Sequence, residues 1–178
     1  MKILKTKFKD LKVIISENFP DERGEFRELF QKRLLNTKKE FKFTCYSRSK
    51  KNVLRGLHLQ KPNGQGKYIS VIRGKILDVA VDLRKKSKLY KKHFKIILSS
   101  KNCKSLYIPD GYAHGFICLE KDNLIVYHLD NYRSKKNEIG IKWNDKTLKI
   151  NWGVKKPVLS KNDENKNISF LDFEKMYN

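Results

Sequence analysis

Two histidines, each close behind a glycine, are the residues of this chain best suited to proton chemistry. His58 ends the run Arg55-Gly56-Leu57-His58, and His114 lies in the run from Pro109 to Phe116, which has Pro-x-Gly-x-x-His spacing. Each run reads as a short apolar strand that follows a glycine turn. An imidazole titrates near neutral pH, so both side chains could take up or release a proton under ordinary conditions.

A metal site is the alternative role for these histidines, and their neighbours argue against it. A protein metal site usually has three or four N, O or S ligands. His58 is followed by Leu59 and Gln60, with no second histidine and no glutamate in a ligand position. No Gly-x-Gly-x-x-Gly run for a dinucleotide is present either. We therefore expect no metal and no other cofactor.

Length and composition predict a single folded domain over residues 1–178. Hydrophobic residues make up 39% of the chain, enough for a full core at this length. No apolar run approaches the length of a membrane span, and the N-terminus lacks the hydrophobic run of a signal peptide. The three cysteines form no Cys-x-x-Cys pair. These features predict a reduced, cytoplasmic protein that does not bind membranes.

The charge is strongly positive, with 41 basic and 19 acidic residues and a formal net charge of +22. Such a field attracts nucleic acids and other anions. The lysines are spread along the whole chain, however, and no aromatic-interleaved RNA-binding signature or helix-turn-helix pattern is present. We expect a solvated lysine surface that could also attract a small anionic substrate, and no nucleic-acid partner.

The centre of the chain reads as strands, most clearly from Tyr68 to Arg84, with Gly74 at a turn or bulge. After Gly74 the side chains alternate between two faces. One face is apolar, and the other is small or polar, which suits the wall of a barrel that holds a polar site. The apolar face carries Leu77, Val79, Val81 and Leu83, and the other carries Ile76, Asp78, Ala80 and Asp82.

Further strands are predicted by the same alternation. In Val53 to Gln60, the residues Leu54, Gly56, His58 and Gln60 are expected on one face. In Leu124 to Asn131, Ile125, Tyr127 and Leu129 are expected opposite Val126 and His128. Other short strands are predicted at His93 to Leu98, Ser105 to Ile108 and His114 to Leu119. Helix is expected only at Ser169 to Met176 and at Ser99 to Lys104. The whole pattern indicates an all-β barrel or jelly roll.

An ordered series of motifs between about residues 19 and 163 carries a family resemblance. The motifs are Asp21 to Phe26, Asn52 to Gln60, Gln65 to Lys67, Asp78 to Arg84, Ile108 to Phe116, Tyr127, Tyr132, Glu138-x-Gly140, Trp143 to Asp145 and Leu159 to Asp163. This set resembles the dTDP-4-dehydrorhamnose (4-keto-6-deoxyhexose) 3,5-epimerase family, including related GDP-4-keto-heptose epimerases. The resemblance implies a cupin jelly-roll barrel with short peripheral helices.

The reaction of that family explains the residue types. A 4-keto group acidifies the hydrogens on C3 and C5 of the sugar, so a base can remove one and an acid can return a proton to the opposite face. The resemblance implies His58 as the base, with Asp163 fixing its tautomer, and Tyr127 as the acid. The alternatives are a core histidine bonded to backbone and a tyrosine that only packs.

The resemblance also implies residues that stabilise the enolate oxygen and bind the substrate. Lys67 and His114 are expected at the oxygen, and Asp78 would orient one of them or act as a structural carboxylate. Arg48 is left open between a phosphate contact and a surface charge. The positions implied for substrate binding are Arg23, Phe26, Glu28, Arg55, Gln60, Tyr132, Arg133 and Glu138.

Departures from the family pattern concentrate at the nucleotide end. Phe43 and Cys45 stand where the family usually has Gln and Asn, Arg133 stands where an aromatic residue stacks on thymine, and Asn162 replaces a lysine. Catalytic residues are kept while base-recognition residues change. The substrate could therefore carry dTDP or GDP on a hexose or a heptose, and C3, C5 or both could be inverted.

The leading hypothesis is a nucleotide-sugar epimerase of capsule or lipopolysaccharide biosynthesis. A 3,4-ketoisomerase and a non-catalytic sugar- or anion-binding cupin are the alternatives. The resemblance further implies a homodimer that exchanges N-terminal strands, with Arg23 and Phe26 reaching the neighbouring site. Alternation of Leu11, Val13 and Ile15 could supply the exchanged edge strand.

Overall fold

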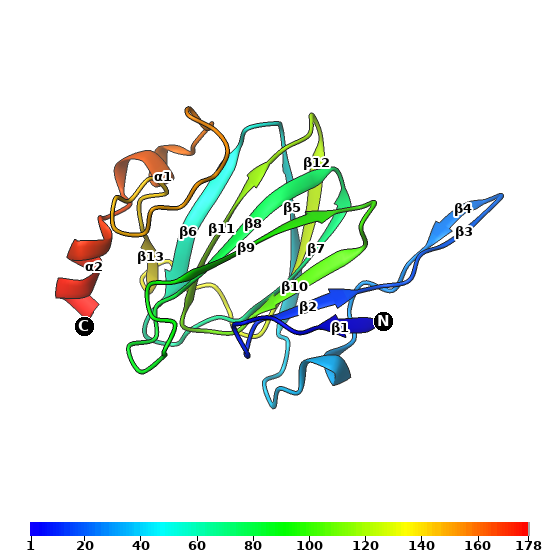
Figure 1. Ribbon diagram of the computed structural model, residues 1–178, viewed down its shortest axis with the longest axis horizontal. Helices are drawn as coiled ribbons and strands as arrows, with labels where there is room; N and C mark the ends of the chain where they lie inside the picture. The colour runs from blue at the N-terminus through cyan, green and yellow to red at the C-terminus, as the bar shows by residue number, and fades with distance from the viewer. Residues whose placement is uncertain (178) are drawn as a thin grey trace.

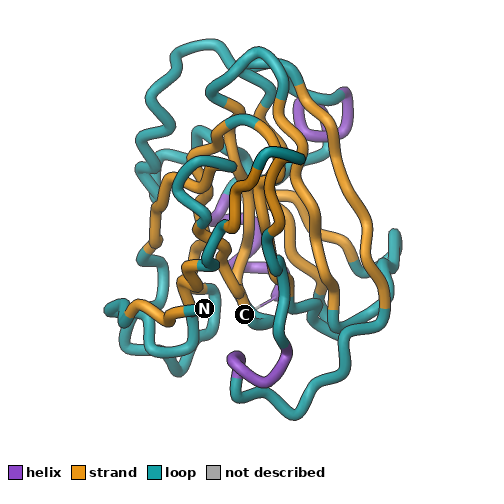
Figure 2. Tube along the Cα trace, turned by 90° about the vertical axis from the view of Figure 1, so that its right-hand side faces the viewer, coloured by secondary structure: helices purple, strands orange, loops and turns teal. Residues whose placement is uncertain are grey.

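The computed structural model describes residues 1–177 and contains two antiparallel sheets that face each other, with one hairpin outside them (Figure 1). The six-stranded sheet has the order β1 (Lys2–Leu4), β2 (Lys12–Ile15), β10 (Lys104–Ile108), β7 (Lys67–Arg73), β12 (Asn123–Leu129) and β5 (Phe43–Ser49). The five-stranded sheet has the order β13 (Glu138–Gly140), β6 (Leu54–Gln60), β11 (Tyr112–Cys118), β8 (Lys75–Asp82) and β9 (His93–Ser99). The strands run between loops gathered at both ends of the barrel (Figure 2). The predicted all-β jelly roll is confirmed.

Three apolar clusters hold these layers together. The main core lies between the sheets, and a second covers the outer face of the five-stranded sheet with the chain that follows Gly140. That chain carries the short helix α1 (Lys161–Asn165) and the helix α2 (Phe170–Tyr177). A third cluster packs the region of the 3-10 helix η1 (Lys32–Leu35) on the six-stranded sheet. The helix predicted at Ser169 to Met176 is confirmed within one residue at each end.

The two faces predicted for β8 are confirmed. Val79 and Val81 are fully buried in the outer cluster under the C-terminal segment. Ala80 lies in the core between the sheets, and Asp78, on the same face, is 0% exposed. Gly74, with a φ of +84°, lies between β7 and β8, which belong to different sheets. The predicted turn is therefore the corner at which the chain crosses from one layer to the other.

The face predicted for Leu54 is wrong, because β6 contains a bulge. His58 pairs with His114, but Arg55 pairs with Phe116, so two residues of β6 oppose Gly115. A Cβ atom on Gly56 would lie 2.5 Å from the Cα of Gly115, which leaves room only for glycine. The bulge turns Arg55 and His58 to the same inward side, while Leu54 faces the outer cluster.

The helix predicted at Ser99 to Lys104 is also wrong, since the chain makes a tight turn there. Asn102 Oδ1 accepts a hydrogen bond from the Ser99 amide, and Ser99 Oγ accepts one from the Asn102 amide. Cys103 has a φ of +51°, which ends the turn and starts β10. Local side-chain bonds of Ser and Asn compete with helix in this way.

The N-terminal segment divides into a part inside the barrel and a part outside it. Strand β2 pairs with β10 of its own chain, and Leu11 and Val13 are buried in the main core. This pairing describes the single chain, so the exchange of N-terminal strands between two subunits stays a prediction. The hairpin of β3 (Phe19–Asp21) and β4 (Gly24–Phe26) instead projects away from the barrel (Figure 1).

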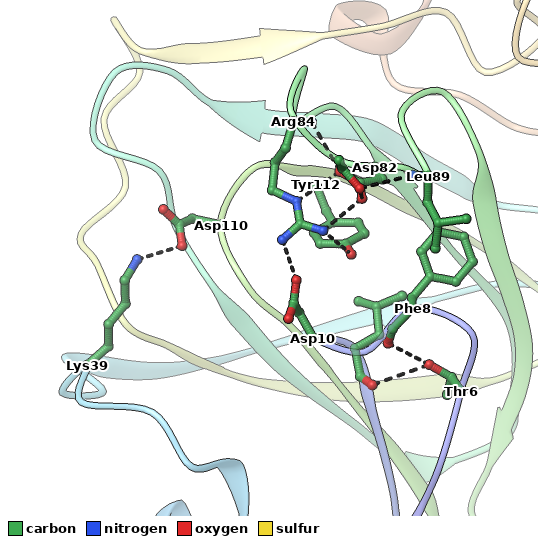
Figure 3. Close-up of polar contacts among 11 residues, drawn as sticks. Thr6, Phe8, Asp10, Lys39, Asp82, Arg84, Leu89, Asp110 and Tyr112 are labelled. Carbon is green, nitrogen blue, oxygen red and sulfur yellow. Dashed lines mark hydrogen bonds and ion pairs between the residues drawn. The ribbon is translucent and has the colours of Figure 1, made fainter.

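A charged cluster fastens the N-terminal segment to the end of β8 (Figure 3). Arg84 donates to Asp82, which is fully buried, and its guanidinium also contacts Asp10 and the hydroxyl of Tyr112. Burial acts to raise the pKa of Asp82, but hydrogen bonds from Arg84 and Ser87 outweigh it and hold that pKa below its ordinary value. The buried carboxylate thus depends on Arg84 for its countercharge.

Replacing Arg84 with alanine should lower the free energy of unfolding by roughly 2–4 kcal/mol, because Asp82 loses its partner in a dry site. The matched control Asp10→Asn removes an exposed partner and should cost less than about 1 kcal/mol. Asp82 has a depressed pKa, so its contribution is present above the ordinary carboxyl pKa near 4 and is lost as the pH falls through the folded value. Urea titrations at neutral and acidic pH measure both effects. Equal destabilisation by the two substitutions would contradict this account.

Candidate active site

The predicted catalytic residues converge from both sheets on the space between them. His58 on β6 and His114 on β11 are direct cross-strand partners, so their side chains lie on the same inward face of the five-stranded sheet. Tyr127 lies on β12 of the six-stranded sheet and packs against the core between the sheets. His58 and Tyr127 therefore enter one barrel from opposite walls.

His58 forms a hydrogen-bonded pair with Asp163 of α1, with 2.5 Å between His58 Nε2 and Asp163 Oδ1. A carboxylate only accepts, so Nε2 carries the proton and Nδ1 keeps its lone pair. The side chain of Asp163 is 5% exposed, and its other oxygen accepts from Ser160 Oγ at 2.8 Å. Burial acts to raise the pKa of Asp163, but the bonds from His58, Ser160 and Asn167 hold it below its ordinary value.

Gly140 makes this approach of the C-terminal segment possible. It pairs with His58 across β13 and β6 and so shares the inward face. A Cβ atom at this position would lie 1.8 Å from Asn167 Oδ1. The missing side chain lets Asn167 come in over the edge of the sheet, where it donates weakly to the carbonyl of Gly56 at 3.3 Å. Asn167 and Asp163 thus reach the inner face around β13.

His114 has its own carboxylate, since Nε2 lies 2.9 Å from Asp78 Oδ2. Asp78 is fully buried, and His114 is 6% exposed. The pair fixes His114 with Nε2 as the donor, which leaves Nδ1 for another partner. Asp78 therefore orients the histidine, one of the two roles considered for it.

Tyr127 is held against apolar neighbours with one polar contact at its hydroxyl. Its ring lies 6.4 Å from that of Phe116, and its hydroxyl lies 2.8 Å from Ser47 Oγ. Loss of surrounding water raises the pKa of Tyr127, with Ser47 acting in the opposite direction. His128, its neighbour on β12, faces outward and stacks on Phe30, as the predicted alternation requires.

Lys67 begins β7 at the mouth of the barrel. Desolvation lowers the pKa of Lys67 to about 8, although Glu138 and Asp130 act to raise it. Cys45 lies close enough for Lys67 and Arg133 to act electrostatically on its thiol. The lowered pKa lets Lys67 release its proton closer to neutral pH than an ordinary lysine does.

Tyr132, Arg133 and Glu138, three of the residues predicted to bind substrate, lie together at this mouth. Tyr132 is 66% exposed, and its ring is stacked on that of Phe43 at 6.0 Å and 7°. Arg133 donates to Glu138 at 2.8 Å. Arg55 lies on the inner wall, where its Nε donates to Ser49 Oγ at 3.1 Å.

The side-chain amide of Gln60, predicted to contact substrate, is hydrogen-bonded to the backbone of a neighbouring loop. Its amide donates to the carbonyl of Tyr132 at 3.2 Å and accepts from the amide of Ser134 at 2.7 Å. It is 7% exposed and ties the loop that carries Tyr132 to the barrel. Arg48 donates to both oxygens of Asp122 in a surface ion pair.

Arg23, Phe26 and Glu28 are not brought into the barrel of their own chain. Arg23 and Phe26 belong to the projecting β3–β4 hairpin, where Arg23 contacts Asp21 and Phe26 is 67% exposed. Glu28 follows the hairpin, is exposed and accepts from Gln31. These three positions can serve a site only outside the single-chain barrel.

Sequence reasoning missed Ser47, Ser160, Asn167 and the close approach at Gly140. Ser160 and Asp163 have the i, i+3 spacing of an N-cap, and Ser160 Oγ does accept from the Asp163 amide. Ser47 shares a face with Cys45 by simple alternation. Gly140 belonged to the Glu138-x-Gly140 motif, but its close approach to Asn167 depends on tertiary contact between distant parts of the chain, which the local sequence does not indicate.

Two further observations concern cofactors and membranes. Within residues 1–177, no three His, Cys, Asp or Glu side chains are grouped in a way that could hold a metal ion. The helices of that same range are too short or too polar for any of them to cross a membrane. All three cysteines are free, with Cys45 exposed and the others buried.

Comparison with known proteins identifies the family. The sequence model of dTDP-4-dehydrorhamnose 3,5-epimerase matches residues 5–169. The chain belongs to this family. It is 41% identical over 170 residues to the dTDP-4-dehydrorhamnose 3,5-epimerase of Shigella flexneri, covering 93% of this chain and 94% of that one. Family membership makes the protein an isomerase, a carbohydrate epimerase of nucleotide-sugar biosynthesis.

Solved structures of the family agree with the fold. The Elizabethkingia anophelis epimerase has a TM-score of 0.88 at 38% identity and covers 97% of both chains. The Legionella pneumophila enzyme, solved in complex with dTDP-4-keto-L-rhamnose, also has a TM-score of 0.88 at 38% identity, over 92% of this chain and 89% of that one. The cupin-like jelly roll predicted from the resemblance is thus confirmed.

Proposed function

We propose that this protein inverts C3 and C5 of a dTDP-linked 4-keto-6-deoxyhexose through an enolate. The observation that carries the proposal is the entry of His58 and Tyr127 into one barrel from opposite sheets. Epimerisation needs a base on one face of the sugar ring and a proton donor on the other. A binding protein has no use for that arrangement.

In this mechanism His58 Nδ1 removes the proton beside the 4-keto group, while Asp163 holds Nε2 and stabilises the imidazolium that forms. Negative charge develops on the keto oxygen. Lys67 and His114 stabilise that charge, and Asp78 keeps His114 oriented for it. Tyr127 then delivers a proton to the opposite face, which inverts the carbon. His58 returns its proton to water.

The nucleotide diphosphate is proposed to lie at the barrel mouth. Arg55 supplies a forked guanidinium that suits phosphate oxygens. Tyr132 offers an exposed ring for the base, and the paired Arg133 and Glu138 offer hydrogen bonds beside it. Relatives from Shigella to Methanothermobacter, at 41% and 36% identity, are named for dTDP-linked substrates. We therefore favour dTDP over GDP, and place the product in capsule or lipopolysaccharide sugar synthesis.

We also propose that the active form is a homodimer in which the β3–β4 hairpin reaches the neighbouring barrel. Phe19 and Phe26 are 54% and 67% exposed on this hairpin, and the hairpin's strands pair only with each other within residues 1–177. Arg23, Phe26 and Glu28 would then serve the partner's substrate, as the resemblance implies. Light scattering on active protein should give twice the chain mass. A fully active monomer would contradict the exchange.

The function is tested by incubating the protein in deuterated water with 4-keto sugars linked to dTDP or to GDP. The dTDP-4-keto-6-deoxyhexose should take up deuterium at C3 and C5 with inversion, because both positions flank the keto group. NMR reports the positions and the configuration. A keto group moved to C3 would indicate a ketoisomerase, and turnover of the GDP-linked heptose alone would reassign the substrate. Absence of exchange with every substrate would contradict the epimerase proposal.

A further inference from the structure

Ser47 is the polar neighbour of the candidate acid, and the mechanism above does not use it. It lies on β5 opposite Ile125, a fully buried member of the main core, so its side chain faces inward. Its Oγ lies 2.8 Å from the hydroxyl of Tyr127. Within residues 1–177 this is the hydrogen bond recorded for the Tyr127 hydroxyl, so the phenol is oriented by a single contact.

The setting of Tyr127 makes that contact important. Once the phenol has given up its proton, its oxygen carries a negative charge in a desolvated setting, where Asp78 disfavours that charge and Arg55 favours it. A buried charge needs a hydrogen-bond donor to be tolerated. A serine hydroxyl can accept from the neutral phenol and then, by rotating, donate to the phenolate.

Ser47 also lies near solvent. Strand β5 is at the edge of the six-stranded sheet, and Cys45, two residues earlier on the same face, is exposed. Ser47 itself is half-buried. A proton passing from solvent to Tyr127 along this edge would meet Ser47 as the last hydroxyl before the phenol.

We propose that Ser47 is a positioning residue that orients the Tyr127 hydroxyl and resupplies its proton after each inversion. The inference rests on the proposed epimerase function and deepens it. It adds a route by which a new proton reaches Tyr127 after each transfer to the sugar.

The proton balance of one inversion is as follows. His58 takes a proton from the sugar carbon, and Tyr127 gives one to the opposite face of that carbon. The proton of Ser47 then moves to the phenolate while water at the edge of β5 gives a proton to Ser47 Oγ in the same step, so no serine alkoxide forms. His58 releases its proton to water, so no net proton is consumed. A second inversion on the same bound sugar requires this reloading first.

The test compares Ser47→Ala with Ser47→Thr, which restores a hydroxyl, and with the matched control Thr44→Ala. Thr44 lies on the same strand but faces outward, where it bonds His128. Deuterium exchange at C3 and C5 reports removal of protons by His58, and product configuration reports delivery by Tyr127.

Ser47→Ala should keep exchange near the wild-type rate while inversion falls by about 10- to 100-fold, less than the roughly 10²- to 10⁴-fold cost of losing the acid itself. Sugar inverted at one carbon should accumulate, because the second inversion waits for a reloaded phenol. Ser47→Thr should recover most of the inversion rate, and Thr44→Ala should match wild type in both measurements.

Inversion at the wild-type rate in Ser47→Ala would overturn the proposal. An equal fall of exchange and inversion would also overturn it, since that result indicates general damage to the site. If the alanine variant does not fold by thermal melting, Ser47→Val, which has the shape of the threonine variant without its hydroxyl, must show the same split. Failure of the epimerase function itself is recognised separately, because wild-type protein would then show no exchange.

Discussion

The site depends on one constraint: each carboxylate buried inside the apolar barrel needs a hydrogen-bond donor. Asp163 accepts hydrogen bonds from His58 and Ser160. Asp78 accepts one from His114. The same pairs settle which nitrogen of each imidazole carries the proton. The hydrogen bonds that stabilise the buried carboxylates are therefore the same ones that orient the two histidines. Arg84 and Asp82 apply this rule away from the site, where it stabilises the fold.

The residues of the site come from both sheets and from the C-terminal segment, so the site forms only when the whole domain is folded. His58, the proposed base, lies on the five-stranded sheet, and Tyr127, the proposed acid, lies on the six-stranded sheet. Asp163, which bonds His58, lies on a helix that follows both in the chain. Gly140 gives the C-terminal segment its way around the sheet edge. Lys67 illustrates the electrostatic result, because desolvation at the mouth lowers its pKa to about 8. A net charge of +22 outside the barrel adds a long-range attraction for an anionic substrate.

Regular alternation allowed much of this to be predicted from sequence. The two faces of β8, the turn at Gly74 and the inward position of Tyr127 follow from a period of two. That rule failed at Leu54, because a bulge shifts the face of β6 by one residue and its cause lies on the neighbouring strand. The prediction of a helix from Ser99 to Lys104 failed for a local reason, because hydrogen bonds between Ser99 and Asn102 stabilise a tight turn instead. The approach of Asn167 depends on tertiary crossing, which no local pattern records.

The central claim is that His58 and Tyr127 act on opposite faces of one sugar. It is tested most directly by following exchange and inversion together in deuterated water for His58→Asn and Tyr127→Phe, with folding checked by thermal melting. His58→Asn should abolish exchange at every carbon, because no enolate forms without proton removal. Tyr127→Phe keeps the ring, so exchange should persist while inversion falls by about 10²- to 10⁴-fold. Exchange retained without His58, or inversion at the parental rate without the Tyr127 hydroxyl, would contradict the account.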